Sequence, residues 1–565
     1  MCAGMPASLS VAQERDPSVL AYLVIHYILK GESDTRQSEF ACGGSMKTIS
    51  TSTFNFNNII SNDFLYVDKT DYVHKLVQPA FGEYFLSRPR RFGKSLLVST
   101  LKAVFQGRRE LFKGLAIDQA DYDWKAYPVI HLDFGMCNVR TAEMLEDYLN
   151  HLLLKEATAL GLGLRERGAS VRFENLVSDA AEKSKENSVV VLVDEYDKPI
   201  LGNISNKDNN QAILDTLKGF YSVIKGCEGL IRFAFITGVS KFAHVSLFSD
   251  LNNLTDITLN PEYAGMLGFS EAEIRENFAD RIPLAAEANN CTEEELMRTL
   301  LKWYDGYRFS KAATHVCNPV SVSKFFNEGY EFSNYWDDTG MPSFLLKIAR
   351  EKAYDYEAAL SDWYDKSVFS AYELDQLDVT GLLWQTGYLT IKDVRQGRRG
   401  LQYRLDFPDM EVMDTFSMRL LEYYGKVEKG GGGTLVDSFA DAILTDDLER
   451  FMTLFQSFLA NISYDMHLPY EKYYQTIFFV VFKLLGASIE AESRTNEGRI
   501  DAYIRTTKAV YIFEFKLNKM SRKAVGQIID QRYYEKFQGG ELPIRMVGVN
   551  FNSKKGRIDG WTVFN

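Results

Sequence analysis

The stretch FLSRPRRFGKS, residues 85–95, ends in Gly93-Lys94-Ser95, the last three residues of a phosphate-binding loop. A run typical of a strand, EYFLS, precedes it, and apolar residues follow Lys94 at helical spacing. In such a strand-loop-helix unit, backbone N–H groups surround the phosphates, the lysine contacts the outer phosphates and the hydroxyl of the serine binds magnesium. The stretch therefore predicts a nucleotide site, although Arg88 occupies the position of the usual first glycine.

The same stretch has a second interpretation. Arg88, Arg90, Arg91 and Lys94 form a dense basic group that is suited to contact a nucleic-acid backbone. The motif alone leaves nucleotide binding and a basic patch equally open.

A second motif favours the nucleotide site. The apolar run VVVLVDEYD ends in Asp194 and Glu195, about a hundred residues after the Gly-Lys-Ser sequence. An aspartate in this position can hold the magnesium shell, and the adjacent glutamate can orient or activate the attacking water. Two acids at the end of a strand can also simply begin a loop, but a basic patch would not need them.

A third apolar run, FAFITGVSKF, ends in polar residues. Thr237, Ser240 and Lys241 are candidates for sensing the terminal phosphate, and ordinary turn residues are an equally good interpretation of each.

Alternation of short apolar runs with helical stretches predicts the fold class α/β. We expect a P-loop NTPase-type parallel sheet with helices on both faces over residues 46–260 and a helical, aromatic middle region over 261–429. Four glycines at 430–433 predict a flexible linker, and a final α/β domain is expected over 434–565. Residues 1–45 are expected to be an extension outside the fold, because Met46 begins a more ordinary MKTIS start.

Charge and cysteine content limit the possible binding partners and the cellular location. The net charge is -12, yet residues 499–565 contain thirteen Lys or Arg and six Asp or Glu, an asymmetry typical of a nucleic-acid surface. The six cysteines form no CxxC pair, which argues against a zinc site and a disulfide framework. No apolar run approaches the roughly 20 residues that span a bilayer. We therefore expect no membrane contact and a cytoplasmic location.

The segment GRIDAYIRTTKAVYIFEFK predicts a metal site near the end of the chain. Glu514 and Lys516 alternate with phenylalanines on a strand and so share one face, and Asp501 begins the neighbouring strand of a hairpin. Two carboxylates and an amine suit metal-dependent phosphodiester hydrolysis. A surface Glu-Lys pair on an edge strand is the competing interpretation. Glu471, on an upstream helix, can add a third carboxylate, and Gln527, on a basic aromatic helix, is placed for phosphate contact.

Together these segments resemble a bacterial family with an N-terminal AAA-ATPase-like domain and a C-terminal PD-(D/E)XK nuclease-like domain. The resemblance extends from about residue 54 to about residue 551, and the RPRRFGKS and NYW segments are its most specific parts. The matching stretches are YVDKTDYVHKL, FLSRPRRFGKSLLVSTL, VIHLDF, VLVDEYDKPI, FITGVSKF, LNNLTDIT, WYDGYRFS, NYWDDTG, QTGYLTI, GRIDAYI and FEFKLN.

The resemblance implies a restriction-endonuclease-like fold for the last domain and makes Arg88 normal for this variant of the loop. It implies nucleotide handling by Lys94, Ser95, Asp194 and Glu195. It also implies a nuclease centre at the following residues: Asp501, Glu514 and Lys516, with Gln527 in support. One departure is Tyr473-Tyr474, where the family commonly has Tyr-His, which puts cleavage in question.

We therefore expect an ATP-binding and ATP-hydrolysing protein whose nucleotide state controls a Mg²⁺-dependent endonuclease acting on DNA. If the ATPase works as a ring, a homo-oligomer is expected, with an arginine supplied by a neighbouring subunit. The competing hypothesis is a nucleotide-dependent switch or scaffold whose nuclease-like domain binds DNA or protein without cleaving.

Overall fold

The computed structural model describes most of the chain from residue 46 to residue 565. The residues outside the description are 1–45, 166, 205–206, 242–246, 249–250, 252, 337–344, 347, 350–351, 353, 371–377, 426–430, 462–476, 478–479, 486–489, 494–501, 553–554 and 556. The expected N-terminal extension, 1–45, therefore lies outside the described residues. No helix in the described part of the chain is long and apolar enough to cross a membrane.

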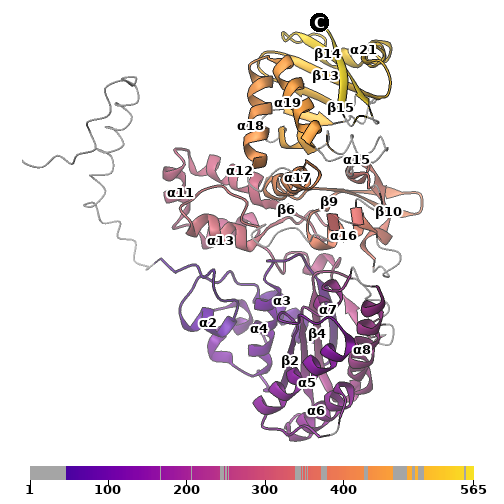
Figure 1. The fold of residues 1–565 in the computed structure, drawn as a ribbon. Helices are drawn as coiled ribbons and strands as arrows, with labels where there is room; N and C mark the ends of the chain where they lie inside the picture. Colours follow the sequence, from indigo (N-terminus) through magenta and orange to yellow (C-terminus); the bar gives the residue numbers. More distant parts are fainter. Residues whose placement is uncertain are drawn as a thin grey trace, which may run out of the picture. The chain divides into compact units, whose positions relative to one another are not determined.

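The first region contains a five-stranded parallel sheet with the strand order β2-β3-β4-β1-β5 (Figure 1). The strands are β1 (Gly82–Ser87), β2 (Val129–Asp133), β3 (Val189–Asp194), β4 (Ile231–Gly238) and β5 (Thr255–Asp256). The first four coincide with the apolar runs that predicted strands. The two-residue β5 lacks such a run, and the sequence did not predict it.

Helices cover both faces of this sheet, as predicted. Alternate side chains of a strand enter different cores: Leu86 belongs to one and Phe85 to the other. The core that contains Leu86 includes side chains of α2 (Phe56–Ser61), α3 (Thr70–Val77) and α4 (Lys94–Phe105). The core that contains Phe85 includes side chains of α5 (Ala142–Ala159), α6 (Ala169–Lys183) and α8 (Lys207–Gly226).

The middle region is mainly helical, as predicted. Two of its helices begin with capping boxes, Ser270 with Glu273 and Thr292 with Glu295, which satisfy N–H groups of the first turn. Its helices are α10 (Glu271–Asn277), α11 (Ile282–Ala288), α12 (Glu293–Tyr304), α13 (Pro319–Asn327), α15 (Tyr356–Ser361), α16 (Val379–Thr386) and α17 (Met410–Gly425).

The middle region also contains β structure that the sequence did not predict. A three-stranded antiparallel sheet with the order β8-β10-β9 consists of β8 (Trp363–Tyr364), β9 (Thr390–Gly397) and β10 (Gly400–Asp406). The hairpin of β9 and β10 turns at Arg398 and Arg399. A shorter pair is formed by β6 (Asp305–Tyr307) and β7 (Val316–Cys317).

The last region is an α/β unit around a five-stranded mixed sheet with the order β11-β12-β13-β14-β15 (Figure 1). Only β13 and β14 run parallel, and α21 packs on them. The elements are α18 (Gly431–Leu444), α19 (Leu448–Asn461), β11 (Glu490–Ser493), β12 (Ala502–Arg505), β13 (Val510–Leu517), α21 (Ser521–Asp530), β14 (Ile544–Asn552) and β15 (Arg557–Phe564).

The predicted glycine linker requires a correction. Gly431, Gly432 and Gly433 form the first turn of α18 instead of a loop, and residue 430 lies outside the described residues. Glycine is a poor helix former, yet Met418 of α17 lies 3.3 Å from where a side chain at Gly432 would begin. The close packing of two helices explains glycine there better than a need for flexibility.

Candidate functional site

The loop between β1 and α4 surrounds the ammonium group of Lys94. Lys94 Nζ donates hydrogen bonds to the carbonyl oxygens of Arg88 (3.0 Å) and Pro89 (2.8 Å), and the residue is 7% exposed. Burial lowers the pKa of Lys94, and nearby carboxylates, Asp194 foremost, oppose that effect. Lys94 is thus a buried cation at the carboxyl end of β1, in the position that the loop motif predicts.

The backbone of the loop explains why an arginine can replace the first glycine. The left-handed conformation occurs at Arg91 (φ 66°) and Gly93 (φ 86°), but not at Arg88. Glycine adopts this conformation freely, whereas other residues pay roughly 1–2 kcal/mol. A side chain at Gly93 would meet nothing within 4 Å, so the conformation and not crowding favours glycine there. The backbone at position 88 is not left-handed, so glycine is not required there.

The side chain of Arg88 is directed into the protein. Its guanidinium donates to the carbonyl oxygens of Ser87 (3.0 Å), Thr258 (2.8 Å) and Tyr263 (3.3 Å) and lies 4.2 Å from the ring centroid of Phe309. Arg88 is 1% exposed, and burial lowers its pKa to about 9. The structure therefore places Arg88 as a support that joins β1 to the segment after β5, and not as a phosphate or nucleic-acid contact.

The other two arginines of the loop differ from Arg88 and from each other. Arg91 is half-buried and donates from Nη1 to the carbonyl oxygen of Tyr335 in the middle region. Arg90 is exposed, and its charge contributes to lowering the pKa of Lys94, after the larger effect of burial. Of the predicted arginines, Arg90 therefore has the position that best fits a phosphate contact.

The predicted magnesium residues converge at the carboxyl edge of the sheet. Ser95 is the second residue of α4, and its hydroxyl is near enough to Asp194, the last residue of β3, to lower the pKa of that carboxyl. Asp194 is 3% exposed, and burial raises its pKa to about 6, while the Ser95 hydroxyl and the Lys94 charge act in the opposite direction. A hydroxyl and a carboxylate beside a lysine form a donor set that fits Mg²⁺ bound to nucleotide phosphates.

These groups do not form a metal cage by themselves. Among the described residues, which exclude Asp501 and Glu471, no group of three or more His, Cys, Asp or Glu side chains is arranged to hold a metal ion. Magnesium in nucleotide sites is usually held by one or two carboxylates, water and the phosphates themselves, and Ser95 and Asp194 have the chemistry that such a site needs.

Glu195 has an unusual backbone conformation for a residue with a side chain. Its φ is 52°, in the left-handed region, and such strain is concentrated at functional sites. Its carboxylate Oε2 lies 3.2 Å from Lys198 Nζ, and both side chains are about one-third exposed. The predicted water-orienting glutamate is therefore held at the surface of the site and remains accessible.

Asp133 is a further acid that the sequence analysis missed. It is the last residue of β2 and is paired in register with Asp194 on β3. Its exposed carboxylate accepts from Gly135 N (2.8 Å), and its charge contributes to raising the pKa of Asp194. The available signal was the run VIHLD, which ends in an aspartate as VVVLVD does.

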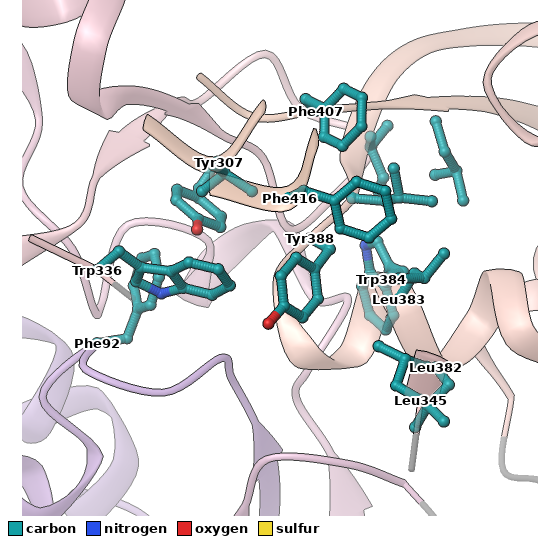
Figure 2. Packing of buried hydrophobic residues seen from close by; sticks show 14 of the residues in the cluster. Phe92, Tyr307, Trp336, Leu345, Leu382, Leu383, Trp384, Tyr388, Phe407 and Phe416 are labelled. Carbon is teal, nitrogen blue, oxygen red and sulfur yellow. The ribbon is translucent and has the colours of Figure 1, made fainter. Parts of the chain in front are cut away.

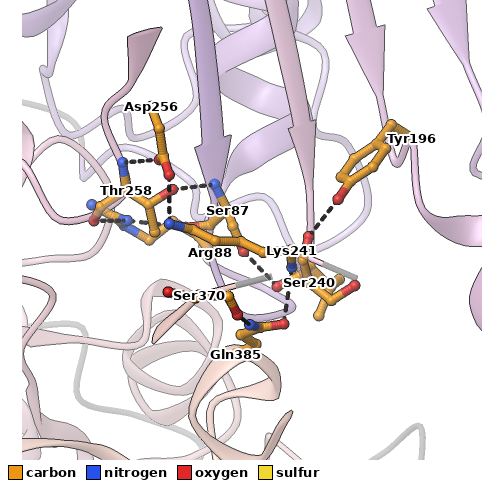
Figure 3. A network of polar contacts seen from close by, with 10 residues as sticks. Ser87, Arg88, Tyr196, Ser240, Lys241, Asp256, Thr258, Ser370 and Gln385 are labelled. Carbon is orange, nitrogen blue, oxygen red and sulfur yellow. Dashed lines mark hydrogen bonds and ion pairs between the residues drawn. The ribbon is translucent and has the colours of Figure 1, made fainter. Parts of the chain in front are cut away.

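The predicted sensor residues at and after the end of β4 contact other protein groups, and Figure 3 shows Ser240 and Lys241 among them. Thr237 Oγ1 donates to the carbonyl oxygen of Leu86 within the sheet (2.8 Å). Ser240 donates through its N–H and its hydroxyl to Asp197 Oδ2, both at 2.7 Å. Asp197 is 1% exposed, and the sequence analysis also missed it.

Lys241 connects this strand end to two other parts of the chain. Its ammonium lies 2.5 Å from Asp256 Oδ2 on β5, and its backbone N–H donates to Gln385 Oε1 on α16 (2.9 Å) (Figure 3). Gln385 in turn donates to the carbonyl oxygen of Ser370 (3.2 Å). The end of β4 is therefore hydrogen-bonded to the middle region.

Residues of the middle region also pack against the phosphate-binding loop. We call these residues the loop-binding surface. Phe92 packs edge-on against Tyr307 and Phe309, with ring centroids 4.7 and 5.3 Å apart, and Figure 2 shows Phe92 beside Tyr307 and Trp336. A side chain at Gly387 would begin 2.6 Å from Pro89 Cβ. The loop-binding surface consists of Tyr307, Phe309, Tyr335, Trp336 and Gly387.

Beneath the loop-binding surface lie two buried acids. The Glu411 carboxylate accepts from Trp336 N (2.7 Å), and Asp409 accepts from Val412 N (2.9 Å). Burial raises the pKa of Glu411 to about 7, and Arg91 is among the groups that oppose the rise. Burial, followed by the charge of Glu411, raises the pKa of Asp409 well above its usual range. Neither acid belongs to a motif that can be recognised in the sequence.

The candidate nuclease centre lies on β13. Glu514 is 1% exposed, and Lys516 Nζ donates to its Oε1 at 2.7 Å, so the two side chains share one face as predicted. Phe513 and Phe515 stack on the opposite face, with ring centroids 6.2 Å apart. The burial of Glu514 excludes the competing interpretation of an exposed surface pair on an edge strand, since β13 is a central strand.

The other predicted nuclease residues are described only in part. The antiparallel hairpin of β12 and β13 is present, with Ala502 opposite Phe513. Asp501, Glu471 and Tyr473-Tyr474 lie outside the described residues. Gln527 is half-buried on α21, a helix that packs on β13 and β14. Residue 548 of β14 must be small, because a side chain there would begin 2.3 Å from the carbonyl oxygen of Ser521.

Comparison with known proteins defines the class. Residues 50–248 match the family model of a predicted AAA-ATPase, and residues 469–561 match that of the PD-(D/E)XK nuclease superfamily. A protein of Azotobacter chroococcum mcd 1, described as an uncharacterized protein in the vnfD 5'region, is 35% identical over 510 residues, which cover 89% of this chain and 96% of that protein. The chain therefore belongs to the family that joins an AAA-ATPase-like domain to a PD-(D/E)XK nuclease-like domain.

Among solved structures, the Aeropyrum pernix ORC2 protein (ADPNP-ADP complexes) is 13% identical and covers 62% of this chain and 92% of that chain. Its TM-score of 0.27 is too low to support any argument about this protein.

Proposed function

We propose that the protein binds and hydrolyses ATP at the β1–α4 loop, and that the nucleotide state controls a Mg²⁺-dependent endonuclease centre that acts on DNA. The observation that carries the nucleotide half is the buried carboxyl of Asp194, which lies near Ser95 and the buried ammonium of Lys94 at the carboxyl edge of the sheet. A basic patch would have no use for a buried carboxylate near the serine of the loop.

Each residue of the nucleotide site has a role that follows from its position. Lys94 exchanges its two carbonyl partners for phosphate oxygens, and Arg90 adds a second, exposed cation. Ser95 and Asp194 hold the magnesium ion, which neutralises phosphate charge when bound. Glu195 orients the attacking water from the surface of the site. Asp194 must be ionised for its role, and its pKa of about 6 allows this at neutral pH.

The contacts of the loop support a link between nucleotide state and the rest of the chain. Lys94 is hydrogen-bonded to the carbonyl oxygens of Arg88 and Pro89, and Pro89, Arg91 and Phe92 all contact the loop-binding surface. When Lys94 turns to a phosphate, it releases these carbonyls, and the loop changes its contacts with the middle region. The last helix of the middle region, α17, packs against α18, the first helix of the last region.

In the nuclease-like domain, Glu514 and Asp501 would hold a divalent metal ion, which activates water and stabilises charge on the phosphate. Lys516 would position the nucleophile. Glu514 fits this role because it is buried on a central strand while its partner Lys516 is about one-fifth exposed.

The competing function is a nucleotide-dependent switch that binds DNA or a protein partner without cleaving. It is favoured by Tyr473-Tyr474, where the family commonly has Tyr-His, and by the direct ion pair in which Lys516 occupies Glu514 Oε1 without a metal ion.

The nucleotide half is tested by ATP binding to Lys94→Ala, with Lys102→Ala on the same helix as the matched control. We expect Lys94→Ala to abolish measurable binding and Lys102→Ala to bind as the wild type does. Unchanged ATP affinity in Lys94→Ala would show that the Gly-Lys-Ser stretch is not the site.

The nuclease half is tested with supercoiled plasmid and magnesium, with and without ATP. We expect the wild type and Glu541→Ala, an exposed control in the same domain, to cut in a nucleotide-dependent manner, and Glu514→Ala to be inactive. If the wild type binds plasmid but cuts under no nucleotide condition, the switch function replaces the nuclease function.

A further inference from the structure

A cavity of about 610 Å³ lies between the segment after β5 and the β9–β10 hairpin. Three of its lining side chains are cations from different parts of the chain: Lys311, Lys366 and Arg399. Its one acid, Asp365, accepts from Ser367 N (2.8 Å) as a helix cap, and the Ser367 hydroxyl, followed by this N–H, lowers the pKa of Asp365. The cavity therefore has a positive lining, and its single carboxylate is already engaged.

The three cations are exposed and have no ion-pair partner within the part of the chain that the structure describes. This is unusual in a protein with a net charge of -12, where acids outnumber bases. Lys366 also lies close enough to Lys241 to contribute to lowering its pKa, after the larger effect of burial. Like charges gathered with no ion-pair partner among the described residues point to an anionic ligand.

The positive charge continues along the hairpin beyond the cavity. Residues 390–406 contain five basic and two acidic side chains. Both acids are engaged within the hairpin: Asp393 pairs with Arg404, and Asp406 accepts from Phe407 N (2.8 Å). Arg395 of β9 lies 4.0 Å from the ring centroid of Trp363 on β8, across the central strand β10 of the same sheet. Cations spread over a strand and its turn suit a polymer of phosphates better than one isolated phosphate.

We propose that the middle region binds the phosphodiester backbone of DNA at this place, which we call the hairpin basic surface: Lys311, Lys366, Arg398 and Arg399. The inference rests on the proposed function in taking DNA as the polymer, but it does not require that the DNA is cut. It places a DNA contact outside the nuclease-like domain, next to the hydrogen-bonded network of Lys241 and Gln385 at the end of β4. Bound DNA would then lie near groups that adjoin the nucleotide site.

The test is binding of a labelled 20-base-pair duplex to the full chain without magnesium, followed by fluorescence anisotropy over a range of salt concentrations. The variant combines Lys366→Ala, Arg398→Ala and Arg399→Ala. The control combines Lys155→Ala, Lys218→Ala and Lys225→Ala, which remove the same charge from exposed positions on α5 and α8. All six side chains are exposed, and the thermal midpoint of each variant checks that it folds.

We expect the hairpin variant to bind at least about tenfold more weakly than the control at roughly 0.1 M salt. We also expect the slope of log K against log salt to fall in magnitude by about 2–3, since each lost phosphate contact removes about 0.9 from the slope. Equal affinity and equal slope in the two variants would overturn the inference. A single Arg399→Glu variant is a second test, and we expect it to bind the duplex more weakly than the wild type does.

Two further arms separate the alternatives. Inorganic phosphate and AMP are added as competitors of the labelled duplex. If either displaces it at the total phosphate concentration at which unlabelled duplex does, the assignment to a polymer is overturned. Plasmid cleavage is then measured separately: weakened binding by the hairpin variant together with an inactive wild type would leave the hairpin basic surface standing while the proposed nuclease function fails. If the wild type cuts plasmid and the hairpin variant binds duplex as tightly as the control does, the nuclease function stands and the hairpin basic surface is refuted.

Discussion

Gly387 approaches Pro89 so closely that a side chain at position 387 would begin 2.6 Å from Pro89 Cβ. Gly387 ends α16 in the left-handed conformation, with φ 91°, and Pro89 belongs to the phosphate-binding loop. The middle region and the nucleotide site thus meet at a point where no atom can be added without displacing the loop.

The first prediction concerns this contact. We expect Gly387→Ala to lower the free energy of unfolding by about 2–4 kcal/mol, because it combines left-handed strain with overpacking. We also expect weaker ATP binding, because the loop must move. Gly329→Ala is the control, since Gly329 also has a positive φ, 84°, and open space around it. Thermal unfolding and ATP titration check both effects, and equal behaviour of the two variants would show that the contact is unimportant.

The second prediction separates binding from coupling in the loop. Arg91 donates to the Tyr335 carbonyl oxygen, whereas Arg90 is exposed. We expect Arg91→Ala to bind ATP within a few-fold of the wild type but to lose the dependence of plasmid cleavage on ATP. Arg90→Ala removes the same charge and should instead weaken ATP binding. The opposite pattern, with nucleotide affinity lost only in Arg91→Ala, would refute a coupling role.

The third prediction follows from the burial of Asp194. Its pKa is about 6 in the folded protein and near 3.8 when unfolded, so ionised Asp194 destabilises the folded state at neutral pH. We expect Asp194→Asn to abolish ATP hydrolysis and to raise the unfolding free energy by about 1–3 kcal/mol at pH 7 without magnesium.

The sign of this effect fixes its pH dependence. Below about pH 3.8 the carboxyl is protonated in both states, so the advantage of Asn over Asp should vanish there. It should grow as the pH rises from that value to about 6 and then level off. Denaturant unfolding of both proteins over this range is the measurement, and a constant difference would contradict the assignment.

The fourth prediction concerns Asp133, whose charge contributes to raising the pKa of Asp194. We expect Asp133→Asn to move the acidic midpoint of the ATPase pH profile to lower pH, because Asp194 then ionises more readily. Asp147→Asn, an exposed site on α5, is the control and should leave the midpoint unchanged. An unshifted profile in Asp133→Asn would mean that Asp133 does not act on Asp194 during turnover.

The fifth prediction concerns the ion pair on β13. Lys516→Met removes the cation that lies 2.7 Å from the buried carboxylate of Glu514, and we expect a loss of about 1–3 kcal/mol of unfolding free energy. Added Mg²⁺ should restore much of that stability if Glu514 is a metal ligand. Glu514→Gln removes the charged ligand, so the same metal should stabilise that variant less. Equal responses of the two variants to Mg²⁺ would argue against metal binding at Glu514.

Local features of the chain were predictable. The runs that became β1 to β4 and the helix that follows Lys94 were recognised from apolar spacing, and Glu514 and Lys516 share a face because strand side chains alternate. The two-residue β5 was missed because it is short and exposed. The hairpin of β9 and β10 was missed because many residues of its strands are half-exposed, so the strands lack a continuous apolar signal. The glycines at 431–433 were misread because helix packing, and not local preference, places them in α18.

The sequence by itself determined which groups have nucleotide and metal chemistry, because a lysine, a serine and strand-ending acids carry that chemistry wherever the chain folds. Only the tertiary structure decided what the arginines of the loop do. Arg88 is bonded to Thr258, 170 residues away, and Arg91 to Tyr335, 244 residues away. The sequence does not distinguish an arginine whose guanidinium faces a ligand from one whose guanidinium faces a carbonyl oxygen. The partner of the guanidinium is chosen by the path of the chain, which brings the middle region against the loop and buries one arginine while it leaves another exposed.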